Sequence, residues 1–400
     1  MKYILGIILL VVLLFLCCYF FYCNLDHFTN TNEVITNTKI DTPKIVYKIN
    51  TCKYKTPDNI KKVFEDNDIK EVNNDLKINS TCVYLPCTYD NGENEIENMN
   101  LQLNENNKVF IIHNADEIVA KESLWRNLVS YYGLEKALTM IPMTYILYEK
   151  NDVKRLIEDF DKEKLYILKK NVQRQEGIKI INNLDDIIKN KDGHILVQEL
   201  LQDPYLIKGR KINLRIYVLV VCKGKNFDVY VYKDGFMYYT KDLFKENTIE
   251  AGPNITTGYV DRWIYDVHPL THEDFRKYLD SDRSVTEPEL KVFNSGTKLS
   301  EYVFSNIYNL VRDVFTAFYG KIGNGEKLKN HTCFQLFGLD VAIDNQLQAK
   351  IMEVNKGPDL GSKDDRDGNL KKGLIKDILR TVDLVENNST NKFLKVLEIK

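Results

Sequence analysis

Three oxygen-bearing side chains near the C-terminal end of the sequence have types and spacing that suit a hard divalent cation. Asp340 lies in LFGLDVAI, and Glu353 and Asn355 lie in AKIMEVN, with the polar turn DNQLQ between them. If these segments are antiparallel strands in which Ile343 pairs with Lys350, Asp340 lies opposite Glu353. Two facing carboxylates repel each other unless a positive charge lies between them. The hairpin therefore predicts a Mg²⁺ site built from Asp340, Glu353 and Asn355.

The alternative for this hairpin is a solvated outer face that binds nothing. The apolar letters LFGL, VAI and IM around the acids argue for burial instead. A shift of the strands by one residue would remove the pairing of the two carboxylates, because successive side chains point to opposite faces.

Basic side chains lie on two other predicted strands, where a nucleotide's phosphates could be held. Lys169 and Lys170 end the strand LYILKK, before a polar loop and a second strand. In RKINLRIYVLVV, period-two alternation places Lys211, Asn213 and Arg215 on the face opposite the core-forming residues. Both patterns fit a polyphosphate site, and both also fit an ordinary solvated strand face.

The elements that must position these residues belong to a mixed α/β (α+β) chain. Its 400 residues, 44% of them hydrophobic, suffice for two or three packed subdomains. We expect a small N-terminal α/β subdomain over 44–107 and a larger domain over 108–400, with central and C-terminal subdomains. Within the larger domain, 227–240 reads as the hairpin partner of the preceding strand and has a turn at KDG, and 261–332 reads as helical.

The first 23 residues predict a single transmembrane helix. Residues 3–23 contain no charged or strongly polar side chain, and about 20 such residues cross a bilayer. A cleaved signal peptide is the alternative, but its apolar core usually has only about 7 to 15 residues. We expect an uncleaved single-pass anchor followed by a polar linker over 24–43. The flanking charges leave the side of the membrane open.

The net charge of the chain indicates which classes of binding partner to expect. The net charge is −2, with no basic excess. The sequence therefore gives no reason to expect a nucleic-acid partner.

Four stretches over about residues 108–385 resemble the tubulin-tyrosine ligase family of ATP-grasp amino-acid ligases. AKESLWRNLVSYYG with IPMTYIL is similar to the family's "RKD-LL-NL … P-TY-LP", and YILKK…EGIKI to its "WI-KP … G-GI" phosphate loop. VQELLQDPYLIKGRKINLRIYVLV is similar to "VQ-YI-NPLLI-G-KFDLR-YVLV". CFQLFGLDVAIDNQLQAKIMEVNKGPDL is similar to "CFELFGFD-MID … WLLEVN-SPSL".

This resemblance implies an ATP-grasp fold over 108–400 and an ATP- and Mg²⁺-dependent ligase, expected as a monomer. It joins a free amino acid to a protein or peptide carboxylate through an acyl-phosphate, as in tyrosination, glutamylation or glycylation, with tubulin as the family's usual acceptor. The resemblance gives Mg²⁺ the ligands Asp340, Glu353 and Asn355. It assigns phosphate contacts to Lys121 and Lys169, and it expects the adenine to be framed by Gln198, Glu199, Leu200 and Leu201. Further cofactor contacts are assigned to Asn213 and Thr256. Catalytic roles are assigned to Lys169, Lys211 and Arg215.

The chain departs from the family pattern at several of these positions. Lys170 stands where Pro is usual, Gln175 where Gly is usual and Asn213 where Asp is usual, and the family's Arg near Tyr238 is missing. These departures keep a second function open, that of a catalytically weak nucleotide-binding pseudoenzyme acting as a membrane-tethered adaptor. The presence of all three predicted cation ligands, Asp340, Glu353 and Asn355, favours the enzyme.

Overall fold

The computed structural model describes residues 45–49, 58–72, 81–85, 96–97, 107–170, 177–387 and 390–400. All of them belong to one compact unit, Pro43–Lys400. The predicted membrane anchor, the polar linker and residues 171–176 of the expected phosphate loop lie outside the described residues. No helix in the described ranges is long and apolar enough to span a membrane.

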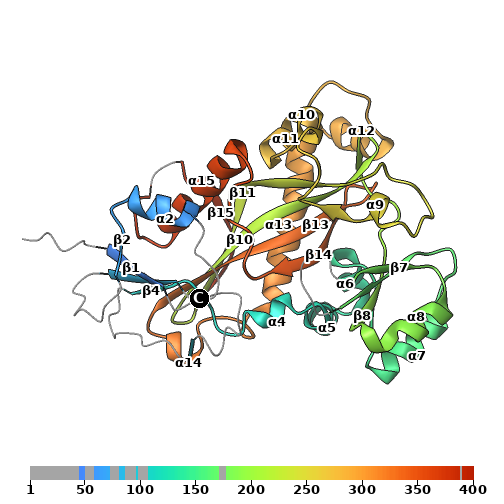
Figure 1. The fold of residues 1–400 in the computed structure, drawn as a ribbon, viewed down its shortest axis with the longest axis horizontal. Helices are drawn as coiled ribbons and strands as arrows, with labels where there is room; N and C mark the ends of the chain where they lie inside the picture. Colours follow the sequence, from blue (N-terminus) through green and yellow to red (C-terminus); the bar gives the residue numbers. More distant parts are fainter. Residues whose placement is uncertain are drawn as a thin grey trace, which may run out of the picture. The chain divides into compact units, whose positions relative to one another are not determined.

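The described chain is a mixed α/β structure built on two sheets (Figure 1). The larger sheet has 11 strands in the order β12-β11-β10-β13-β4-β3-β1-β2, with β14 beside β13, β15 beside β11 and β9 beside β10. Its strands are β1 (Ile45–Ile49), β2 (Lys70–Glu71), β3 (Thr81–Leu85), β4 (Lys108–Val109), β9 (Leu206–Ile207), β10 (Arg210–Lys223), β11 (Asn226–Thr240), β12 (Thr256–Thr257), β13 (Thr332–Ile343), β14 (Ala349–Asn355) and β15 (Phe393–Ile399).

The smaller sheet has four strands in the order β5-β8-β6-β7, all paired antiparallel. They are β5 (Thr144–Ile146), β6 (Tyr166–Lys169), β7 (Lys179–Ile181) and β8 (Leu196–Glu199). The predicted strand, loop and second strand around residues 165–180 are confirmed as β6 and β7. Two helices, α7 (Lys150–Asp159) and α8 (Leu184–Asn190), lie beside this sheet (Figure 1).

Except for η1, which contacts α8, the remaining helices pack around the larger sheet. Four short helices, α10 to α12 and α14, and the long α13 occupy 261–332, so the helical interpretation of that region is confirmed. The helices are α2 (Asp58–Glu65), α4 (Asp116–Val119), α5 (Lys121–Tyr132), α6 (Leu134–Met140), the short 3-10 helix η1 (Lys191–Gly193), α9 (Ala251–Asn254), α10 (Ile264–Val267), α11 (His272–Leu279), α12 (Glu287–Asn294), α13 (Leu299–Phe318), α14 (Gly325–Leu328) and α15 (Asp365–Thr381).

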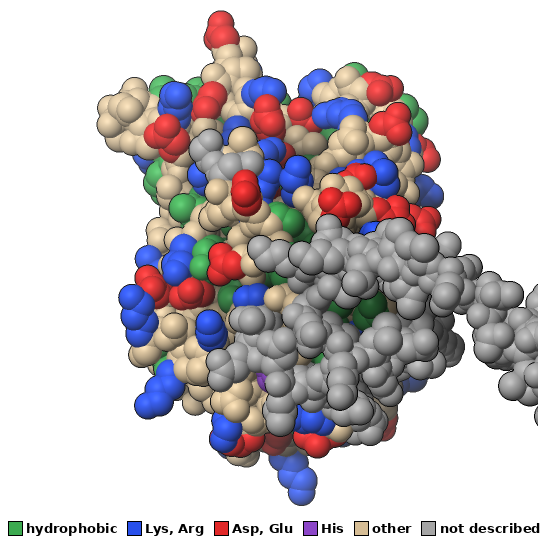
Figure 2. All heavy atoms as spheres, turned by 90° about the vertical axis from the view of Figure 1, so that its left-hand side faces the viewer, with side chains coloured by type: hydrophobic (Ala, Val, Ile, Leu, Met, Phe, Trp, Pro, Cys, Tyr) green, Lys and Arg blue, Asp and Glu red, His purple; other side chains and the backbone are tan. Residues whose placement is uncertain are grey.

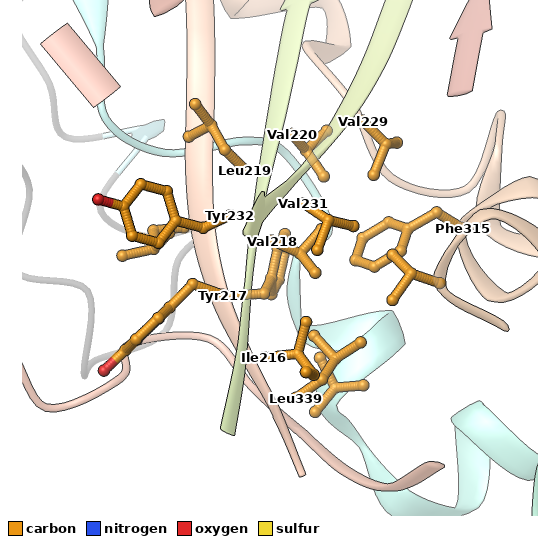
Figure 3. Packing of buried hydrophobic residues seen from close by; sticks show 14 of the residues in the cluster. Ile216, Tyr217, Val218, Leu219, Val220, Val229, Val231, Tyr232, Phe315 and Leu339 are labelled. Atoms are coloured by element: carbon orange, nitrogen blue, oxygen red, sulfur yellow. The ribbon is translucent and has the colours of Figure 1, made fainter. Parts of the chain in front are cut away.

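Both faces of β10 are covered by protein. The expected core residues Ile212, Leu214, Ile216 and Val218 are at most 1% exposed. On the opposite face Tyr217 is also buried, and it points with Tyr232 to the other side of the sheet from Val218 and Phe315 (Figure 3). A strand with one solvated face is therefore wrong for β10, because Lys211 and Tyr217 on the second face are buried as well.

The hairpin of β13 and β14 places Asp340 opposite Glu353, as predicted, but by a different register. Ile343 pairs with Ala349, not with Lys350, and a β-bulge follows between Val341 and Asp340. The bulge inserts one extra residue into β14 and moves the pairing by one position. The alternation of side chains along the strand does not reveal this extra residue in the sequence.

The predicted turn at KDG is wrong. β11 runs without a break from Asn226 to Thr240, and the hairpin turns at Gly224, whose φ is +61°. The register changes between Ile216 opposite Gly235 and Val218 opposite Val231, so KDG forms an irregularity inside the strand. A Cβ at Gly235 would collide with the carbonyl oxygen of Arg215. The glycine is needed for close approach of the strands rather than for a turn.

Candidate functional site

The candidate site is a row of side chains that crosses neighbouring strands of the larger sheet. Arg215 on β10 lies opposite Asp340 on β13, and Asp340 lies opposite Glu353 on β14. Residues directly opposite each other in antiparallel strands point to the same face. Tyr238 on β11 joins this face because it pairs with Asn213, which lies two positions from Arg215 along β10. Segments far apart in the sequence thus meet in one line.

The centre of the row is a two-pronged ion pair. The Nε and one terminal nitrogen of Arg215 donate to the two carboxylate oxygens of Asp340 at 2.8 and 3.2 Å. The guanidinium carbon also lies 5.0 Å from the centroid of the Tyr238 ring, a distance at which ring and cation attract. Burial lowers the pKa of Arg215, but Asp340 outweighs it and the pKa is raised. Arg215 is therefore fixed and charged at every physiological pH.

The predicted cation ligands lie at the other end of this row. Burial raises the pKa of Asp340, against the opposing effect of Arg215, and the carboxylate of Glu353 raises it further. Glu353 lies 3.4 Å from the ammonium of Lys121, the first residue of α5. The side-chain amide of Asn355 donates to the carbonyl of Gly338 at 3.3 Å. Two carboxylates and an amide brought to one place are donors that fit Mg²⁺.

No group of three or more His, Cys, Asp or Glu side chains that could hold a metal occurs within the described ranges. A cation at the hairpin would therefore use two carboxylates and one amide oxygen. Mg²⁺ typically completes such a set with water and substrate phosphates.

A pocket lies between the two sheets, beside the row. From the larger sheet it is lined by Glu353 and its two neighbours, and from the smaller sheet by Lys169 and Gln198, with Lys121 at the start of α5. Lys169 donates to the Gln198 side chain at 2.8 Å, and Gln198 donates to the Thr144 hydroxyl at 2.8 Å. Burial lowers the pKa of Lys169 to about 8. The neighbouring Lys170 is exposed, which separates the two candidate lysines.

Other predicted cofactor residues lie around the connection from β8 to β10. Leu200 and Leu201 are buried, and the ammonium of Lys211 donates to the carbonyl of Leu201 at 2.9 Å. Glu199 pairs with Lys164 at 2.9 Å. Burial lowers the pKa of Lys211 to about 8. Lys211 is therefore held at this connection, whereas Arg215 is held at Asp340.

Two predicted residues remain at the margin of this arrangement. The side-chain oxygen of Asn213 is buried and has no hydrogen-bond partner within the described part of the chain. A buried acceptor without a partner is costly, so a bound donor would stabilise it. Thr256 lies in β12, where it pairs with Thr240 at the end of β11.

Sequence reasoning missed the roles of Thr144 and Tyr238. Thr144 lies in the IPMTYIL stretch, but its bond to Gln198 joins residues 54 apart in the sequence, and no local pattern predicts such a bond. Tyr238 was noted only for a missing arginine. A regular hairpin that turns at Gly224 would place Tyr238 opposite Lys211, and the register shift at KDG moves it opposite Asn213 on the same face.

Comparison with known proteins defines the class. The model of the tubulin-tyrosine ligase family matches residues 99–392, so the chain belongs to this family. It is 31% identical to the probable tubulin polyglutamylase TTLL9 of Rattus norvegicus over 47% of the chain and 38% of that protein. It is 23% identical to the tubulin polyglutamylase TTLL7 of Xenopus tropicalis over 70% of the chain and 32% of that protein.

The relatives share one kind of activity in their names. The chain is also 26% identical to the tubulin monoglutamylase TTLL4 of Mus musculus over 72% of the chain and 24% of that protein. It thus spans between 24% and 38% of the length of these three relatives.

Proposed function

We propose that the protein is an ATP- and Mg²⁺-dependent ligase with an ATP-grasp fold that adds glutamate to a protein carboxylate. The observation that carries the proposal is the row of Arg215, Asp340 and Glu353, which ends beside the pocket holding Lys121 and Lys169. The names of the relatives support glutamate as the amino acid and tubulin as the acceptor.

ATP would lie between the two sheets in this proposal. Lys121 and Lys169 hold its phosphates as point charges, and Gln198 with the buried Leu200 and Leu201 frames the adenine. When bound at Asp340, Glu353 and Asn355, Mg²⁺ offsets the negative charge of the phosphates.

The reaction has two displacements. An oxygen of the acceptor carboxylate attacks the γ-phosphorus of ATP, the bond to the β–γ bridging oxygen breaks, and ADP leaves. The amine nitrogen of glutamate then attacks the acyl carbon, the carbon–oxygen bond to phosphate breaks, and inorganic phosphate leaves while the nitrogen loses its protons to solvent. Arg215, fixed beside Asp340, supplies positive charge where charge develops on the transferring group.

A pseudoenzyme that binds nucleotide and serves as a membrane-tethered adaptor is the second candidate. The observation that favours it is the placement of Tyr238 against Arg215, because the family pattern has an arginine near this position. The facing carboxylates of Asp340 and Glu353 favour the ligase, since a protein without catalysis gains nothing from their repulsion.

The cellular setting belongs to the proposal. We expect a monomer anchored by residues 3–23 in a membrane whose side is undetermined. On the face shown in Figure 2, basic and acidic side chains are mixed over the described surface. A mixed surface supports a protein substrate rather than nucleic acid as partner.

The test is turnover by the full chain in detergent with Mg-ATP, tubulin and labelled glutamate, glycine or tyrosine in separate reactions. We expect ADP release and label in tubulin with glutamate, and a loss of about 100-fold or more in Glu353→Gln. Glu326→Gln, at an exposed carboxylate, is the matched control. ATP binding without turnover for any amino acid would leave the adaptor, and full activity in Glu353→Gln would contradict the site.

A further inference from the structure

The row of site residues continues past Arg215, away from the nucleotide pocket, to an ammonium on the loop before α15. A Cβ built on Gly258 would lie 3.0 Å from Cε1 of Tyr238 and 3.2 Å from Nζ of Lys363. The outer edge of the Tyr238 ring and the Lys363 ammonium are therefore neighbours. Tyr238 therefore has Arg215 over its ring and Lys363 near its outer edge.

Lys363 differs from the other basic residues around it. Arg262 pairs with Asp364, and Arg366 pairs with Asp274 at 2.6 Å. Lys363 instead donates to the carbonyl of Gly258 at 2.9 Å and lies 4.2 Å from the ring centroid of Tyr259. No carboxylate in the described part of the chain forms an ion pair with Lys363.

The surroundings of Lys363 favour an incoming anion. Burial lowers its pKa, and the nearby charges of Lys371 and Arg262 lower it further against the opposing effects of Asp359 and Asp367. A cation without an ion pair in the described part of the chain gains when a carboxylate binds to it. Tyr259, which is 82% exposed, leaves this end of the row open to solvent.

The nucleotide phosphates are assigned to the other end of the row. β14, which carries Glu353, and β11, which carries Tyr238, are separated by two intervening strands, or about 14 Å at the usual strand spacing. A phosphate held by Lys121 and Lys169 at the pocket lies beside β14, and Arg215 on β10 stands between it and Tyr238. A second reactant is therefore the better source of an anion at Lys363.

We propose that Lys363 binds a carboxylate of the amino-acid substrate, at the opposite end of the row from the ATP phosphates. This inference rests on the proposed ligase function. The amine of the amino acid then points back along Tyr238 toward Arg215, where the acyl-phosphate would form. The unpartnered side-chain oxygen of Asn213, opposite Tyr238, is available to accept a hydrogen bond from that amine.

Binding and turnover test this proposal separately. In a ligand-detected NMR titration, the full chain with Mg²⁺ and a non-hydrolysable ATP analogue receives glutamate. We expect Lys363→Met to weaken glutamate binding about tenfold or more, because a charge-assisted hydrogen bond is lost. In turnover, the KM for glutamate rises similarly, while the KM values for ATP and tubulin and the kcat at saturating glutamate stay within about twofold.

Two further variants complete the design. Lys363→Arg keeps the charge and restores most of the affinity, and Lys376→Met, at an exposed lysine of α15, leaves all constants unchanged. Unchanged glutamate binding in Lys363→Met overturns the inference, and so does a rise confined to the KM for tubulin, which would place the acceptor there. Glutamate binding that depends on Lys363 without any turnover overturns the ligase but upholds Lys363 as the carboxylate site.

Discussion

The two buried lysines of the nucleotide region carry their charge only over part of the pH range. Lys169 faces the pocket, and Lys211 holds the carbonyl of Leu201. Burial lowers the pKa of each to about 8, from 10.5. Since burial disfavours the charged form, each amine is protonated below about pH 8 and becomes neutral above it. Phosphate binding needs the protonated form of Lys169.

We therefore expect the affinity of the protein for ATP to fall as the pH rises through about 8. The apparent Kd, measured by equilibrium binding between pH 7 and pH 9, should rise about tenfold, since one unit above the pKa leaves roughly a tenth of the amine charged. Lys169→Arg keeps its charge and should flatten this dependence. An unchanged pH profile in that variant would remove Lys169 from phosphate binding.

At the scale of elements, the packing of Pro358 and the Arg215 side chain against β13 depends on Gly338. A Cβ at this position would lie 2.8 Å from Cβ of Pro358 and 3.1 Å from Cδ of Arg215. Contacts this short force a neighbour to move. The glycine thus leaves the space in which Arg215 lies against Asp340.

Gly338→Ala should displace Arg215 and lower kcat by about tenfold or more, while overpacking costs about 1 to 3 kcal/mol of stability. Turnover assays and thermal unfolding measure the two effects. Gly193→Ala is the matched control, because a Cβ there meets no atom within 4 Å. Wild-type turnover in Gly338→Ala would show that the position of Arg215 does not limit the reaction.

The same strands show how far sequence reasoning reaches. Period-two alternation located the face of Lys211, Asn213 and Arg215 correctly, because a strand fixes which side chains share a side. It failed at KDG, because this sequence is typical of a turn, whereas its glycine is required here by the close packing of the two strands. The local sequence determines which side chains share a face of a strand, whereas the partner strand determines where the register shifts.

At the scale of the whole molecule, the N-terminal residues are joined to the site. β4 pairs in parallel with both β3 and β13, so the strands before residue 107 continue the larger sheet. The buried side chain of Asn59 in α2 donates to the carbonyl of Leu360 at 2.8 Å and to the hydroxyl of Ser362 at 2.9 Å. This contact joins residues about 300 apart, and no local pattern predicts it. The boundary at 107 remains a prediction.

Asn59→Ala should loosen the loop that carries Lys363, because Ser362 precedes Lys363 directly. We expect a loss of about 1 to 3 kcal/mol of stability from the buried carbonyl left without its donor. We also expect a higher KM for glutamate, measured in the same turnover assay. Asn67→Ala, which removes a bond within the neighbourhood of α2 only, should leave that KM unchanged. An unaltered KM for glutamate in Asn59→Ala would show that the contact of α2 with this loop does not influence the site.

The bulge in β14 makes the spacing of the two carboxylates along the chain a poor guide to their meeting. Continued without the bulge, the pairing of Ile343 with Ala349 and Val341 with Ile351 would bring Met352 opposite Asp340 and turn Glu353 to the other face. One additional residue converts a thioether neighbour into a carboxylate neighbour. Insertions and deletions in this hairpin are therefore not neutral changes of loop length, because each one decides which side chain faces Asp340.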